Sequence, residues 1–219
     1  MKNFIDVLKR VSLFNDIEEN DLLRMLSCLG ARVEFFDKKY TIFAEGGSTK
    51  NIGILLSGSV QLIRNDYYGN RSLLAEVAPA ELFAESFACA ELDEMPISAV
   101  ANEPSHVMLI EGSHILHTCN NGCGFHHRLI FNLMRELATK NIMFHQKIEI
   151  TSKRTTREKL LTYLDIQAKK AGKSSFEIPF DRQELADYLE VERSGLSAEI
   201  SKLKREGVID ADKNKFTVL

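Results

Sequence analysis

The chain has 219 residues, which is enough for one large domain or two modest ones with separate cores. Its 44% hydrophobic and 27% charged residues are typical of a globular protein in water. No apolar run approaches the roughly 18 residues of a membrane helix, and the first residues lack the apolar segment of a signal peptide. Four cysteines form no disulfide framework in a chain of this length. We therefore expect a cytoplasmic protein with no membrane partner.

The net charge of −3 conceals an asymmetry along the chain. Residues 151–219 contain 14 Lys and Arg against 12 Asp and Glu, which leaves 14 against 19 in residues 1–150. The C-terminal part therefore has a small positive excess, where an anionic partner would bind.

The first 111 residues contain two kinds of pattern. Residues 1–30 have apolar side chains at helical spacing. Residues 31–111 are short apolar segments separated by turn residues, among them Gly46, Gly47 and Gly58, which predicts paired strands in a β-barrel or β-roll.

A heptad pattern follows in residues 124–150. Apolar residues and one asparagine recur at intervals of three and four residues, as in the core of a coiled coil. These positions are Ile130, Met134, Leu137, Asn141, Phe144 and Ile148. The narrow stripe favours a dimerisation helix in which the asparagine fixes the register. The alternative is a long helix that packs on its own β-domain and exposes Asn141.

The dimerisation helix is expected to end near Thr151-Ser152. Thr155 and Glu158 form a capping box that begins a new helix, and Gly172 ends this helix in a left-handed conformation. Residues 152–154 are then a hinge between domains. The predicted domains are residues 1–123, the helix of residues 124–151, and residues 152–219.

Residues 180–209 predict two short helices joined by a three-residue turn, which is the helix-turn-helix layout. Asp181 and Glu184 form the capping box of the first helix, and the second helix runs from Arg193 to about Glu206. The inward positions are Leu185, Ala186, Leu189, Leu196, Ile200 and Leu203, with Val191 between the helices. Residues 208–219 then predict a hairpin that turns at Lys213-Asn214, a wing beside the second helix.

The polar face of the second helix suits contact with DNA. Arg193 can form two hydrogen bonds with guanine, and Ser194 and Ser197 can reach base edges or phosphate. Arg182, Gln183, Lys202 and Lys204 suit contacts with phosphate. An ordinary helical hairpin with a solvated face is the plainer alternative. The sequence contains no nucleophile elbow, phosphate loop or paired-carboxylate motif, so we do not expect an enzyme.

Taken together, these motifs resemble the cyclic-AMP receptor protein/FNR (CRP/FNR) family of bacterial transcription regulators over almost the whole chain. The resemblance is carried by EGGSTKNIGILLSGSVQLI, the dimer helix and RQELADYLEVERSGLSAEISKLKREGVI. It implies an α+β fold with an N-terminal β-roll like a cyclic nucleotide-binding domain, a long dimerisation helix and a C-terminal winged helix-turn-helix. It also implies a homodimer that binds a near-palindromic operator and acts on RNA polymerase.

Two positions depart from the family's helices. Glu190 occupies a turn position that is often glycine, and a left-handed conformation there would be strained. Ala198 stands where relatives often have an arginine on the reading face. The base preference of a relative therefore cannot be transferred to this chain.

The resemblance also places an effector cassette, formed by Phe83, Ala84, Glu85, Ser86, Ile97, Ser98 and Ala99. Glu85 matches the acidic residue that holds the ribose, and Ser98-Ala99 match the pair that holds the phosphate. The arginine that neutralises the cyclic phosphate is replaced by Ile97. Because a buried phosphate without its cation is costly, we expect an unknown small-molecule effector other than cyclic AMP, or a pocket that has lost its ligand.

A cluster of cysteine and histidine residues lies just before the dimer helix. Cys119, Cys123 and His126 could bind a soft metal or haem iron, and the two thiols could form a redox disulfide. The alternative interpretation is a turn with small buried cysteines and surface histidines. The four-cysteine iron–sulfur arrangement of oxygen-sensing relatives is not matched.

Overall fold

The computed structural model describes residues 2–65, 71–117 and 125–219, and it divides into two compact units, residues 1–138 and 139–219. The long helix α5 (Phe125–Thr151) contributes its first half to one unit and its second half to the other. Within the described ranges, no helix combines the length and the apolar character needed to cross a membrane.

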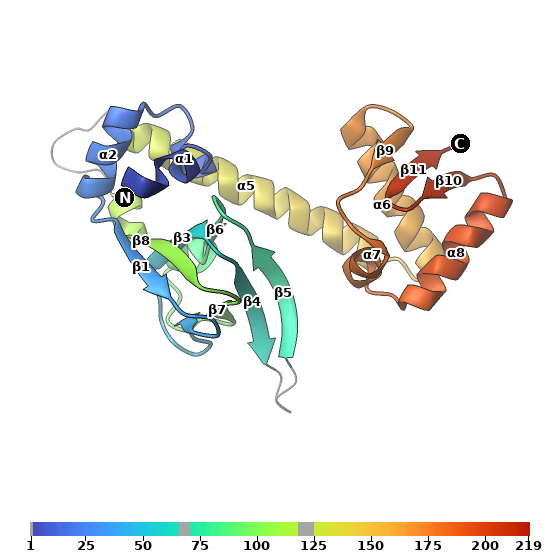
Figure 1. The fold of residues 1–219 in the computed structure, drawn as a ribbon, viewed down its shortest axis with the longest axis horizontal. Coiled ribbons are helices and arrows are strands. Elements are labelled where there is room, and N and C mark those ends of the chain that lie inside the picture. The colour runs from blue at the N-terminus through green and yellow to red at the C-terminus, as the bar shows by residue number, and fades with distance from the viewer. Residues whose placement is uncertain (1, 66–70, 118–124) are drawn as a thin grey trace. The chain divides into compact units, whose positions relative to one another are not determined.

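Two four-stranded antiparallel sheets form the β-roll of the first unit (Figure 1). The strand order is β1-β8-β3-β6 in one sheet and β2-β7-β4-β5 in the other. The strands are β1 (Arg32–Phe36), β2 (Thr41–Phe43), β3 (Asn51–Ser57), β4 (Val60–Asn65), β5 (Arg71–Val77), β6 (Leu82–Phe83), β7 (Ser98–Ala101) and β8 (Ser105–Glu111). Gly58 begins the β3–β4 turn at φ +90°, and a Cβ there would lie 2.3 Å from Ser105 Oγ. The expectation of a glycine-dependent turn is confirmed at this position.

Strands β3 and β8 are buried on both faces, which explains their nearly continuous apolar sequence. In β3, Ile52, Ile54 and Leu56 contribute to a core beneath the helices, while Leu55 contributes to the core inside the roll. Successive side chains of a strand point to opposite faces, so each strand serves two cores at once. The sheet β1-β8-β3-β6 is therefore the central layer of the first unit.

Short helices and the first half of α5 cover the outer face of that sheet. They are η1 (Lys2–Phe4), α1 (Ile5–Leu8), η2 (Ser12–Phe14), α2 (Glu19–Cys28), α3 (Glu85–Cys89) and α4 (Gly112–Leu116). Asn132 of α5 is buried, and its amide donates hydrogen bonds to the carbonyls of Leu13 (3.0 Å) and Asn15 (2.9 Å). Ser12 donates to Glu136 at 2.6 Å. The start of α5 is thus bonded to the N-terminal segment.

The second unit is built on α6 (Thr156–Ala171), α7 (Arg182–Leu189) and α8 (Arg193–Arg205). A three-stranded sheet of β9 (Ser175–Glu177), β10 (Ile209–Asp212) and β11 (Lys215–Val218) completes it, in the order β10-β11-β9. The Thr155–Glu158 capping box and the left-handed Gly172 are present, as the sequence predicts. The hairpin at Lys213-Asn214 is also confirmed, whereas β9 is an additional strand that the sequence analysis did not predict.

Candidate nucleic-acid interface

The helix-turn-helix is formed by α7 and α8, joined by residues 190–192. Asp181 caps α7, where its side chain accepts from the Glu184 N–H and Glu184 in turn accepts from the Asp181 N–H. All six residues predicted to point inward are buried, and Val191 packs partly against the same core. The layout expected from the sequence is therefore confirmed in its boundaries and in its packing.

The opposite face of α8 is exposed. Arg193, Ser194, Ser197, Ala198 and Lys202 all lie on the surface of the second unit. Arg193 is the first residue of the helix, and Glu192 provides no side-chain hydrogen bond to the helix N-terminus. The backbone N–H groups of the first turn and the adjacent guanidinium are therefore open to a negatively charged or polar partner.

Several cations around this face are bound to protein groups. Arg157 of α6 pairs with Glu199 of α8 (3.3 Å) and with Glu206 at its C-terminal end (2.7 Å), which joins α8 to α6. This arginine lowers the pKa of the Glu206 carboxyl below its usual value. Lys204 pairs with Asp210 at 3.0 Å at the base of the wing. In the part of the chain that the structure describes, Arg193 and Lys202 have no such partner.

Arg182 and Gln183, at the start of α7, have hydrogen-bond partners within the protein. The Arg182 guanidinium donates to the Lys213 carbonyl at 3.1 Å and lies 5.6 Å from the centre of the Phe216 ring. Burial is the main cause that lowers its pKa, with repulsion from Arg193 as a smaller one. Gln183 donates to Asp187 at 2.8 Å. Arg182 therefore joins the first helix to the turn of the wing.

The six positions of the predicted dimer stripe lie along α5. Met134, Phe144 and Ile148 are exposed by 59%, 65% and 61%, and Asn141 is also exposed. Ile130 and Leu137 are half-buried, and Leu137 packs partly against the helical core of the first unit. Large apolar side chains in contact with water at heptad spacing favour a protein partner for this side of the helix.

The effector cassette surrounds the junction of β6 with α3 and the start of β7. Ala84 caps α3 in the left-handed conformation, and Glu85 is only 4% exposed. Ile97, Ala99 and Phe83 belong to the apolar core inside the roll. The Ser98 hydroxyl accepts a hydrogen bond from the Glu45 N–H at 2.9 Å. Ser86 is exposed.

The interior of the roll beside this cassette is filled by aromatic and aliphatic side chains. The rings of Phe43 and Phe83 lie 5.7 Å apart, and a Cβ on Gly53 would lie only 2.3 Å from Phe83. A pocket of about 550 Å³ lies elsewhere on the roll, and it is lined in part by Arg32, Tyr40 and Lys50. None of the cassette residues lines that pocket.

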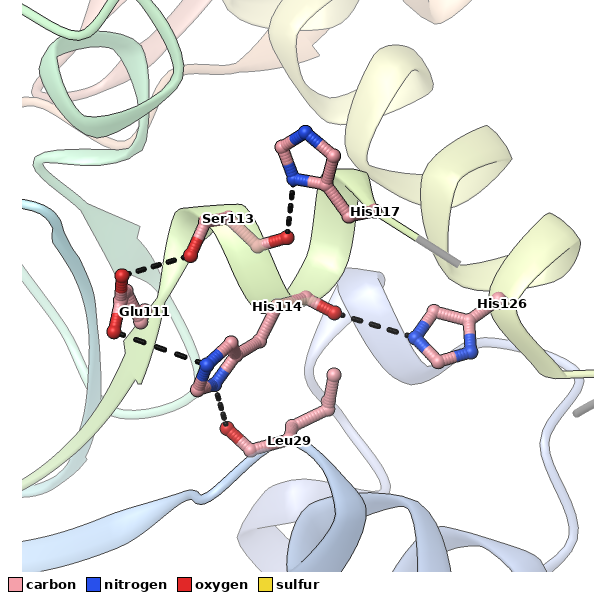
Figure 2. A network of polar contacts seen from close by, with 6 residues as sticks. All are labelled: Leu29, Glu111, Ser113, His114, His117 and His126. Carbon is pink, nitrogen blue, oxygen red and sulfur yellow. Dashed lines mark hydrogen bonds and ion pairs between the residues drawn. The ribbon is translucent and has the colours of Figure 1, made fainter. Parts of the chain in front are cut away.

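Three histidines near the start of α5 bond to separate backbone carbonyls (Figure 2). His114 Nδ1 donates to the Leu29 carbonyl at 2.9 Å, and His117 Nδ1 donates to the Ser113 carbonyl at 3.0 Å. His126 is buried, and its Nε2 donates to the His114 carbonyl at 3.2 Å, so this nitrogen has no lone pair left for a metal. Among the described residues, no three His, Cys, Asp or Glu side chains are grouped as metal ligands.

The predicted Cys119 and Cys123 lie outside the described residues. A metal or redox site that includes them therefore stays a prediction.

Two residues near the helix-turn-helix were not singled out in the sequence analysis. Lys147 of α5 contacts the α7–α8 turn, and Tyr188 of α7 supplies the carbonyl to which it donates. These residues are 41 positions apart, and no sequence spacing connects them.

The comparisons with known proteins agree with this architecture. The cyclic nucleotide-binding domain family matches residues 33–121, and the Crp-like helix-turn-helix domain family matches residues 158–219. A comparison with curated proteins gives no match. The structure of OCPA-complexed CprK has a TM-score of 0.64 at 16% identity, with 90% of this chain and 88% of that chain covered.

Two further solved structures share the fold. The c-di-GMP-responsive regulator CLP of Xanthomonas campestris has a TM-score of 0.59 at 14% identity, with 92% of this chain and 99% of that chain covered. The sensor domain of the transcriptional regulator DNR of Pseudomonas aeruginosa has a TM-score of 0.54 at 21% identity, with 70% of this chain and 95% of that chain covered.

The predicted N-terminal β-domain and C-terminal helix-turn-helix are thus both confirmed, in that order and with a long helix between them. The expectation of a non-enzymatic regulator is confirmed with them. The chain belongs to the CRP/FNR family of DNA-binding transcriptional regulators, with an N-terminal effector-sensing domain and a C-terminal helix-turn-helix.

Proposed function

We propose that this protein acts as a homodimer whose two α8 helices bind successive major grooves of a near-palindromic operator. The bound dimer regulates transcription through contact with RNA polymerase. The observation that carries the proposal is the exposed N-terminal end of α8. There Arg193, Ser194 and Ser197 face outward, while the cations nearer the core are bonded to protein groups. Arginine at this place in a reading helix suits two hydrogen bonds with O6 and N7 of guanine.

The division of roles follows from the contacts. Arg193, Ser194 and Ser197 read base edges, and Lys202 neutralises a phosphate. Arg182 and Gln183 contact the backbone only in part, because Arg182 also bonds to the wing turn and Gln183 to Asp187. Because Lys and Arg exceed Asp and Glu by only 14 to 12 in residues 151–219, attraction to DNA depends more on where the cations lie than on the net charge.

Dimerisation brings two such helices together. The exposed side chains of Met134, Phe144 and Ile148 would pair with the same residues of a second copy, with Asn141 opposite its equivalent. Such a seam is self-complementary, as two-fold symmetry requires. A polar asparagine at one core position of a two-stranded coiled coil selects one register at a cost in stability.

The affinity for an operator selected from random sequences is expected to fall as salt is added. The logarithm of the binding constant should decrease linearly with the logarithm of the salt concentration. Every phosphate neutralised contributes about −0.9 to the slope, because its counterions are released on binding. Fluorescence anisotropy between about 50 and 200 mM salt measures the slope. A flat response, or equal affinity for the selected and a scrambled duplex, would contradict the proposed function.

The effector is a small molecule other than cyclic AMP. Between Leu82 and Ala99 the chain has four acidic residues and no Lys or Arg. Ile97 is 9% exposed within an apolar core, so a phosphate at this place would lose water without gaining a cation. A ligand of this cassette is therefore less anionic than a cyclic nucleotide.

Cyclic AMP is accordingly expected to leave the melting temperature unchanged. A specific ligand at 100 times its Kd stabilises a protein by about 2.7 kcal/mol, which is a rise of several degrees for a chain of this size. Differential scanning fluorimetry with millimolar cyclic AMP checks this, and the Ile97→Arg variant serves as the comparison. A saturable rise of the melting temperature in the unaltered protein would show that the Ile97 argument is wrong.

A further inference from the structure

The turn between α7 and α8 contains a residue in a conformation that suits glycine. Glu190 has φ 53° and ψ 56°, which is the left-handed region, and it carries a Cβ. The left-handed conformation brings Cβ close to backbone oxygen, so a residue other than glycine needs support from its surroundings. The turn sets the direction in which α8 leaves α7, so this support bears directly on the reading helix.

Two lysines from other helices bond to this turn. The Lys147 ammonium of α5 donates to the Tyr188 carbonyl and lies 3.6 Å from the Glu190 carboxylate. The Lys159 ammonium of α6 donates to the Glu190 carbonyl at 3.2 Å. The backbone before Glu190, its own carbonyl and its side chain are thus all held by cations.

The Lys147 side chain is itself partly buried and packs on an aromatic ring. Its side chain is only 29% exposed, and its ammonium lies 4.3 Å from the centre of the Tyr188 ring. That ring packs against Phe180 (4.9 Å) and Tyr163 (5.4 Å), whose rings also contact each other. Burial is the main cause that lowers the pKa of Lys147, and the Glu190 carboxylate opposes it. Side chains from α5, α6 and α7 therefore meet at this contact.

We propose that Lys147 is a positioning residue for DNA binding. It stabilises Glu190 in the left-handed conformation, which a glycine at that position would adopt without support. It also joins the dimerisation helix to the turn that sets the direction of α8. Ile150, which is 1% exposed in the core of the second unit, attaches the same end of α5. A change at the end of α5 would then reach α8 through Lys147 as well as through this core contact. This inference rests on the proposed function, since aiming α8 matters only if α8 binds DNA.

The test is a pair of substitutions and their combination. Lys147→Met keeps most of the aliphatic stem but removes the ammonium. We expect operator affinity to fall at least about tenfold, the lower end of what one lost charge-assisted hydrogen bond produces. Glu190→Gly alone should change the affinity by less than about twofold, since glycine adopts this conformation freely. The double variant Lys147→Met/Glu190→Gly should return to within about twofold of the unaltered protein, because its turn no longer needs the lysine. Lys170→Met, at an exposed lysine of α6, is the matched control and should have no effect.

Affinity, its salt dependence and the melting temperature are measured for all variants. A double variant as weak as Lys147→Met, or a Lys147→Met variant with full affinity, would overturn the proposal. If the salt slope of Lys147→Met is about 1.8 shallower and Glu190→Gly does not restore it, Lys147 contacts a phosphate directly in each protomer, which also overturns the proposal. If Lys147→Met does not fold, recovery of a folded protein in the double variant supports the proposal and continued unfolding contradicts it.

A failure of the proposed function is distinguishable from a failure of this inference. If no variant binds DNA, including the unaltered protein, the melting temperatures still form a double-mutant cycle. The lysine substitution should lower the melting temperature in the Glu190 background and have a smaller effect in the glycine background. Equal losses in both backgrounds would overturn the role of Lys147 whatever the protein binds.

Discussion

Replacing Arg193 by alanine is expected to remove most of the discrimination between the operator and other DNA. A guanidinium that forms two hydrogen bonds with a guanine contributes about 1–3 kcal/mol at each half-site, and the dimer loses both contacts, so specific affinity should fall by about 30-fold or more. Non-specific affinity should fall much less, because it depends on the number of neutralised phosphates. Anisotropy with an operator duplex and a scrambled duplex at one salt concentration measures both.

The loss in Arg193→Ala would not come from unfolding. Arg193 is exposed, and among the described residues it has no ion-pair partner. Alanine at the start of a helix is also a good helix former. Removal of a positive charge from the helix N-terminus is also mildly favourable. The melting temperature should therefore be unchanged or slightly higher.

Lys202→Ala is the matched control, because it removes a positive charge from the same helix at a residue that we expect to contact phosphate. It should weaken binding to both duplexes to a similar degree and make the salt slope about 1.8 shallower, because the dimer loses one phosphate contact in each protomer. If Arg193→Ala gives that uniform pattern instead, Arg193 binds phosphate and does not read a base. If it leaves both affinities unchanged, α8 is not the reading helix.

Local sequence signals are enough to predict most of this fold. The capping boxes at Thr155 and Asp181 and the left-handed Gly172 appear where the residues require them, because each satisfies backbone groups of its own helix end. The inward leucines of α7 and α8 follow from helical period alone. These features depend on neighbours three or four positions away, so the sequence shows them directly.

The features that could not be predicted depend on contacts between distant segments. Arg182 looks like a free cation at a helix start, yet its guanidinium is bonded to a wing carbonyl 31 positions later. The short strand β9 gains its structure from pairing with β11 and has little pattern of its own. Lys147 lies off the apolar stripe of α5, and nothing in the spacing shows that Tyr188 and Glu190 would surround it.

The sensing cassette is an intermediate case. The replacement of the expected arginine by Ile97 is visible in the sequence, and it predicts a site that does not suit a phosphate. The filling of the roll by Phe43 and Phe83 is a tertiary property, since the two rings come from β2 and β6. Only their packing shows how little space remains beside the cassette.

Phe144→Glu is expected to convert the protein to a monomer and to lower operator affinity by more than about 100-fold, since a dimer gains the second half-site without a second association cost. Phe144 is 65% exposed in the single chain, so a glutamate there leaves the cores of both units intact. In the proposed dimer, however, two carboxylates would face each other in an apolar seam. Sedimentation velocity at micromolar protein measures the oligomeric state, and anisotropy on full and half operators measures the binding.

The neighbouring residue provides the control that isolates the seam. Met143 is 61% exposed on the same helix, but it lies about 100° around the helix from Phe144 and off the heptad stripe. Met143→Glu introduces the same charge with the same helix propensity, and it should remain a dimer with unchanged operator affinity. If Met143→Glu dissociates the protein as readily as Phe144→Glu, the whole surface of α5 is sensitive to charge. If Phe144→Glu stays dimeric, the second copy is bound by a different surface.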